Sequence, residues 1–125
     1  MKHVAIFGCG IGGRRACLHL RSKYKVAAFL DNNRKVHGSR LLGLPVCDPE
    51  IYDYNQVEHV FIASMYFDEI LVQLLMLGVP SSKIECVSEG ILMRESPNTL
   101  DGWFAFSGSF NLLRRAFYVP FRFLR

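Results

Sequence analysis

Long apolar runs are absent from this chain of 125 residues. No stretch approaches the roughly 18 to 20 apolar residues that are needed to cross a bilayer. A single lysine precedes a short apolar run that Gly8 breaks, whereas a signal peptide has a charged start and a continuous apolar stretch. We therefore expect a soluble domain body in the cytoplasm.

Paired metal ligands are also absent. Cys9, Cys17, Cys47 and Cys86 form no C-x-x-C pair, and no histidine lies at metal-ligand spacing from them. Their arrangement does not resemble the disulfide framework of a small secreted domain. We expect reduced and mostly buried cysteines and no metal site, and only Cys9 lies within a motif.

Clustered positive charge is absent from most of the chain, although the net charge is +4. Residues 1–101 contain 11 Lys or Arg and 11 Asp or Glu, so this part is neutral. The excess comes from Arg114, Arg115, Arg122 and Arg125 near the end of the sequence. A neutral body has little attraction for polyanions, so we expect no nucleic acid as a partner.

Complete catalytic patterns are absent as well. No tyrosine is followed by lysine at the Tyr-x-x-x-Lys spacing of short-chain dehydrogenases and epimerases, and the four histidines are scattered. We expect no catalytic residues, which favours a binding module over an enzyme. An alternative remains open: a small NAD-dependent nucleotide-sugar oxidoreductase or epimerase that a partner completes, with Tyr66 as the acid.

The chain does contain an alternation of strand and helix patterns. Short apolar runs at 3–7, 25–30, 59–63 and 83–87, with a weaker one at 44–47, are typical of buried parallel strands. Helix patterns occupy 14–22 and the segment from a Ser64 N-cap to Gly78. The sequence predicts a Rossmann-like α/β fold, an open, mainly parallel sheet of order 3-2-1-4-5 flanked by helices.

A glycine pattern, G-x-G-x-x-G, covers Gly8 to Gly13, directly after the first predicted strand. We call this segment the glycine turn. Gly8 permits a tight turn, Gly10 lets the backbone approach a phosphate, and Gly13 allows close packing of helix and strand. The helix N-terminus then faces the anion. The pattern predicts a nucleotide-binding turn, and a purely structural turn is the alternative.

Side chains at two further strand ends belong to the predicted site. Asp31, at the end of the second strand, would accept hydrogen bonds from ribose hydroxyls, which favours NAD over NADP. Arg14 is a candidate phosphate neighbour, whereas Arg34 and Lys35 either contact phosphate or are solvated loop charges. Tyr66 either contacts the ligand or only covers the side of the second helix.

Several segments resemble the Rossmann-like domain of bacterial polysaccharide-biosynthesis proteins. They are AIFGCGIGGRRA, AAFLDNN, GSRLLGLPV and FIASMYFDEILVQLLMLGVPSSKI, and the resemblance extends over about residues 3–88. Such domains precede the catalytic parts of nucleotide-sugar dehydratases and of sugar-amine acyltransferases. The resemblance implies that residues 1–90 bind a nucleotide or nucleotide-sugar, with NAD or a UDP-sugar as the cofactor or ligand and coenzyme A as a further option.

The predicted binding residues combine the glycine turn with the two strand ends. They are Gly8, Gly10, Ile11, Gly12, Gly13, Arg14, Asp31, Asn32, Ser64, Met65 and Tyr66. The expected partners are a nucleotide-containing small molecule and either a second copy of the chain, as in a dimer or other homo-oligomer, or a polysaccharide-biosynthesis enzyme.

The segment after residue 90 differs in composition. Residues 91–125 contain a loop-rich stretch and then an aromatic, basic and amphipathic run. This extension predicts packing on the domain, dimerisation, or peripheral contact with a membrane or protein partner.

Overall fold

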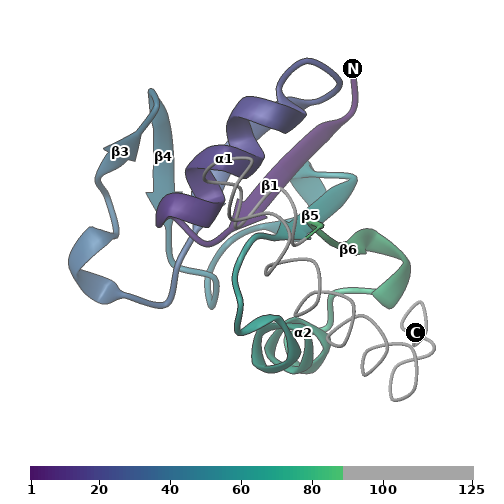
Figure 1. Cartoon of the computed structure of the whole chain (residues 1–125). Helices are drawn as coiled ribbons and strands as arrows, with labels where there is room; N and C mark the ends of the chain where they lie inside the picture. The colour runs from purple at the N-terminus through teal and green to yellow at the C-terminus, as the bar shows by residue number, and fades with distance from the viewer. Residues whose placement is uncertain (89–125) are drawn as a thin grey trace, which may run out of the picture. The chain divides into compact units, whose positions relative to one another are not determined.

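The computed structural model describes residues 1–88. Within them, six strands form one sheet in the order β3-β4-β2-β1-β5-β6 (Figure 1). The strands are β1 (His3–Phe7), β2 (Lys25–Leu30), β3 (Arg40–Leu41), β4 (Leu44–Cys47), β5 (His59–Ile62) and β6 (Ile84–Cys86). All neighbouring pairs are parallel except β3–β4, which is antiparallel.

Two helices, α1 (Ile11–Leu20) and α2 (Phe67–Met76), flank the sheet (Figure 1). The crossovers from β1 to β2 and from β5 to β6 run in opposite directions along the sheet. Because parallel crossovers are right-handed, the two helices cover opposite faces. On one face, Val4 and Ile6 of β1 pack with Ala16 and Leu20 of α1.

Short 3-10 turns complete the described chain. They are η1 (Arg34–Val36), η2 (Tyr54–Gln56) and η3 (Ser81–Lys83).

None of the helices within residues 1–88 is both long enough and apolar enough to cross a membrane. The predicted extension at 91–125 lies outside the described residues, so its packing, dimerisation or membrane role stays a prediction.

The fold class is confirmed, and the five predicted strands lie in the predicted order. One strand, β3, was not predicted. It pairs with β4 through a tight hairpin in which Leu42 has a φ of 52° and Gly43 a φ of 79°. A strand of two residues shows no alternation, and Leu-Gly lacks the Asn-Gly or Asp-Gly signal of such turns.

Both helix starts differ from the prediction. α1 begins at Ile11, not at residue 14, although Gly12 and Gly13 have low helix propensity. Tyr66, not Ser64, is the N-cap of α2, and the Ser64 hydroxyl instead accepts a hydrogen bond from the Tyr66 amide. The predicted end of α2 at Gly78 is close: the helix ends at Met76, Leu77 is the C-cap, and Gly78 follows it with the positive φ of 91° that glycine favours at this place.

Candidate functional site

Two glycines of the turn after β1 are required by the packing of the chain itself. A Cβ on Gly13 would lie 1.8 Å from the carbonyl oxygen of Gly8, which shows how closely α1 approaches β1. Gly8 has a φ of 118°, and a Cβ there would lie 2.7 Å from the carbonyl oxygen of Ala63. These positions need glycine whether or not a ligand binds.

Gly10 differs from both. Its φ is −84°, which any residue adopts, and a Cβ would meet nothing within 4 Å. Neither backbone strain nor a contact within the described chain therefore explains a glycine here. The open space lies directly at the N-terminus of α1, where the backbone of a Rossmann-like turn approaches phosphate.

The N-terminus of α1 has unpaired positive character. Gly10 is the N-cap and has no side chain to accept a hydrogen bond from the first amides, and the first turn contains no acidic residue. Gly10 and Ile11 are exposed, so the start of α1 lies at the surface. The first amides of a helix have no partner within the helix, and the dipole attracts an anion to them.

Arg14 adds to this charge. It lies one turn into α1, is exposed, and its positive charge acts on the thiol of Cys9 within the glycine turn. A cation at this end of a helix is unfavourable unless an anion lies nearby. The role of Arg14 as a phosphate neighbour stays a prediction.

Asp31 ties the end of β2 to the glycine turn. Its Oδ2 accepts hydrogen bonds from the amide and the thiol of Cys9, each at 3.1 Å. Its Oδ1 accepts from the Asn33 amide at 2.8 Å. Three of the roughly four acceptor positions of this carboxylate are therefore occupied within the chain.

The thiol of Cys9 donates a hydrogen bond to the carboxylate of Asp31. Burial raises its pKa from 9.0 to about 11, and the hydrogen bond to Asp31 and the negative charge of Asp31 act in the same direction. Arg14 partly opposes the rise. At neutral pH the thiol keeps its proton, which the contact with Asp31 requires.

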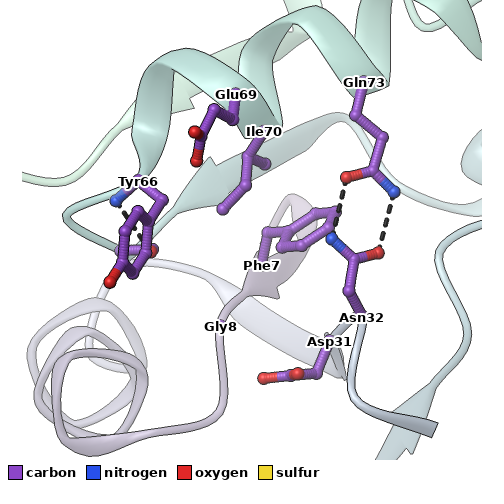
Figure 2. A pocket seen from close by; sticks show the side chains of 9 residues that line it. Phe7, Gly8, Asp31, Asn32, Tyr66, Glu69, Ile70 and Gln73 are labelled. Atoms are coloured by element: carbon purple, nitrogen blue, oxygen red, sulfur yellow. Dashed lines mark hydrogen bonds between the residues drawn. The ribbon is translucent and has the colours of Figure 1, made fainter.

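A pocket of about 450 Å³ opens beside this turn (Figure 2). Its lining residues come from the carboxyl ends of β1, β2 and β5 and from one side of α2. They are Phe7, Gly8, Asp31, Asn32, Ser64, Tyr66, Glu69, Ile70 and Gln73. β1 lies between β2 and β5, and the crossover connections on its two sides run in opposite directions along the sheet. Ligands of open α/β sheets bind at such a topological switch point.

Five predicted residues meet at this pocket, namely Gly8, Asp31, Asn32, Ser64 and Tyr66. The others, namely Gly10, Ile11, Gly12, Gly13, Arg14 and Met65, do not line it. All of these except Met65 belong to the glycine turn or the first turns of α1. Met65 is 37% exposed in the turn before α2.

Sequence reasoning missed the wall that α2 contributes. Asn32 and Gln73 exchange two hydrogen bonds between their side-chain amides, at 2.9 and 2.8 Å, and so connect the end of β2 to α2 (Figure 2). Glu69, Ile70 and Gln73 share one side of the helix, because residues three and four apart are neighbours. That spacing was the available signal, but it does not indicate which strand end the helix approaches.

Arg34 and Lys35 lie in the exposed turn η1 and do not line the pocket. Among residues 1–88, no group of three or more His, Cys, Asp or Glu side chains is arranged to hold a metal ion.

The sequence matches the family model of the C2185-like N-terminal domain over residues 1–85. The chain belongs to this family. The matched range includes the glycine turn, Asp31 and all of α2. A comparison with curated protein sequences gives no match.

Several solved structures are similar to the chain. UDP-D-quinovosamine 4-dehydrogenase from Vibrio fischeri has 21% identity and a TM-score of 0.49, covering 68% of this chain and 75% of its own. RSP, a Rex-family repressor, has 15% identity and a TM-score of 0.56, and the match covers 84% of this chain and 62% of the repressor chain. RSP in complex with β-NAD⁺ and operator DNA has 16% identity and a TM-score of 0.54, and the match covers 89% of this chain and 57% of the repressor chain.

This chain thus spans about three-fifths of the length of the two repressor chains. At these levels of identity the shared feature is the fold. The architecture of β1, α1 and β2 is therefore that of a Rossmann-like domain, in agreement with the sheet order and the glycine turn.

Proposed function

We propose that this domain binds a nucleotide-containing ligand, with the phosphates of the ligand at the N-terminus of α1. The observation that carries the proposal is the contrast within the glycine turn. Gly8 and Gly13 serve the packing of the chain, whereas the space beside Gly10 is open. A glycine that the chain itself does not need leaves room for a ligand.

Charge supports an anion at this place. The first turn of α1 has backbone amides without a capping side chain and no acidic residue, and Arg14 lies at the end of this turn. A diphosphate would accept hydrogen bonds from these amides and would offset the charge of Arg14. The remaining part of the ligand would extend toward the adjoining pocket.

The two ligand classes in the proposal are NAD and UDP-sugars. RSP, which has the same fold, was solved with β-NAD⁺. The resemblance to domains of bacterial polysaccharide-biosynthesis proteins favours a UDP-sugar. In this proposal the domain acts in the cytoplasm as a binding module that serves a polysaccharide-biosynthesis enzyme, and it does not itself perform chemistry.

A thermal-shift panel of NAD, NADP, coenzyme A, UDP and UDP-N-acetylglucosamine tests the proposal on the wild type and on Gly10→Val. A ligand that binds the folded state raises the melting temperature by mass action. We expect one ligand class to stabilise the wild type and to lose its effect in the variant. The variant should fold, because its Cβ meets nothing within 4 Å. A panel without any shift would contradict the proposal.

A further inference from the structure

The two carboxylates that line the pocket differ in what they can still bind. Asp31 accepts three hydrogen bonds from Cys9 and Asn33. Glu69 is exposed on α2, and its carboxylate makes no hydrogen bond or ion pair with any of the residues 1–88. A vicinal diol needs two acceptor positions for its two hydroxyl groups, and Asp31 has about one left.

Three other polar side chains of the pocket, those of Asn32, Ser64 and Gln73, already make hydrogen bonds within the chain. The amides of Asn32 and Gln73 bond to each other, and Gln73 donates in addition to Glu50 at 3.3 Å. The hydroxyl of Ser64 accepts from the Tyr66 amide. Glu69 is therefore the lining carboxylate whose full acceptor capacity remains for a ligand, and Figure 2 shows it on the side of α2 next to Tyr66, apart from the Asn32–Gln73 pair.

The charge of the pocket restricts what it can hold. Asp31 and Glu69 are acidic, and none of the nine lining residues is Lys or Arg. A phosphate placed among these side chains would be repelled by both carboxylates, with no lining cation to offset the repulsion. The pocket therefore suits the uncharged part of a nucleotide.

We propose that Glu69 is a specificity-determining residue that accepts hydrogen bonds from the hydroxyl groups of an unphosphorylated ribose, and that it rejects a ribose bearing a phosphate. This inference rests on the proposed binding of a nucleotide to this domain. It assigns to Glu69 the role that the sequence pattern predicts for Asp31, whereas Asp31 holds the glycine turn in place.

Two pairs of probes test the inference by calorimetry. NADP differs from NAD by one phosphate on a ribose hydroxyl, and 2′-deoxyuridine 5′-diphosphate lacks one hydroxyl of UDP. For the pair that binds, the altered member should bind the wild type at least about 10-fold more weakly, since a hydrogen bond to a charged group contributes about 1.5–3 kcal/mol. In Glu69→Gln, which keeps the shape but removes the charge, this ratio should fall to about 2-fold or less.

Asp68→Asn is the matched control, because Asp68 is the neighbouring exposed acid in the first turn of α2 and does not line the pocket. It should keep the wild-type ratio. An unchanged ratio in Glu69→Gln, while Gly10→Val still abolishes binding, would overturn the role of Glu69 and leave the proposed function intact.

Two other outcomes separate the two proposals. If no probe binds the wild type, nucleotide binding at Gly10 fails and the role of Glu69 fails with it. If Glu69→Gln lowers the ratio but Gly10→Val binds as well as the wild type, the place of the phosphates is wrong and the role of Glu69 stands.

Discussion

The units β1–α1 and β5–α2 have the same strand–turn–helix order but opposite charge at the start of the helix. α2 has Asp68 and Glu69 in its first turn, which complement the positive end of the helix dipole. α1 has no acid in its first turn, and Arg14 adds positive charge. Thus α2 carries negative charge in its own first turn, whereas α1 carries none there, and this is the place to which we assign a phosphate of the ligand.

The two turns are also held differently. After β5, the hydroxyl of Ser64 accepts a hydrogen bond from the Tyr66 amide two residues later, so a contact within the turn stabilises it. After β1, the amide and the thiol of Cys9 bond to Asp31, which lies 22 residues away at the end of β2. The shape of the glycine turn therefore depends on a neighbouring strand.

The largest expected effect comes from Gly13→Ala, which tests the close packing of α1 that has no counterpart in α2. The new Cβ would lie 1.8 Å from the Gly8 carbonyl oxygen, so α1 would have to move away from β1. We expect a loss of about 4 kcal/mol or more in the free energy of unfolding, measured by denaturant titration.

Gly10→Ala is the control for that variant. Its Cβ meets nothing within 4 Å, and it should lose about 1 kcal/mol or less, as for an N-cap change. Equal losses in the two variants would show that the two glycines do not play different parts in the fold.

The fold was predictable where local patterns and general topology rules sufficed. The apolar runs predicted five strands, and the alternation with helices predicted their order. The start of α1 was not predictable, since Gly12 and Gly13 disfavour a helix and only the tertiary contact of Gly13 with Gly8 explains it.

For the candidate site, the turn and Asp31 were predictable from spacing. The α2 wall depends on the Asn32–Gln73 pair, whose members lie 41 residues apart.

Ile11→Glu tests the charge difference between the helices by giving α1 an acid in its first turn, as α2 has. Ile11 is 63% exposed, so little packing is lost. We expect the variant to gain about 0.3–1 kcal/mol of stability. Nucleotide binding, measured by calorimetry, should weaken because the new carboxylate competes with phosphate. Ile11→Gln serves as the uncharged control, and equal binding by the two variants would argue against an anion at α1.

A smaller effect is expected from Cys9→Ala, which removes the thiol contact between the glycine turn and Asp31. The folded state raises the pKa of Cys9 from 9.0 to about 11, so the stability that the protonated thiol contributes is complete below pH 9. It is lost as the pH rises through 11. The melting temperature of the wild type should therefore fall more than that of Cys9→Ala between these pH values.

Cys47→Ala is the matched control for this pH series, because burial alone raises the pKa of Cys47. It should change the pH dependence less than Cys9→Ala does. If both variants follow the wild type, the hydrogen bond from Cys9 to Asp31 contributes nothing measurable to the turn.

Calorimetric titration of Gly10→Asp and Gly10→Asn, with the ligand that stabilises the wild type, tests directly whether the N-terminus of α1 holds the phosphates of a nucleotide. Asp and Asn are both favourable N-caps, so both variants should melt at or above the wild-type temperature without ligand. We expect both variants to lose affinity, Asp by at least 10-fold more than Asn, because only Asp adds a negative charge where the phosphates would lie. Wild-type affinity in Gly10→Asp would contradict it.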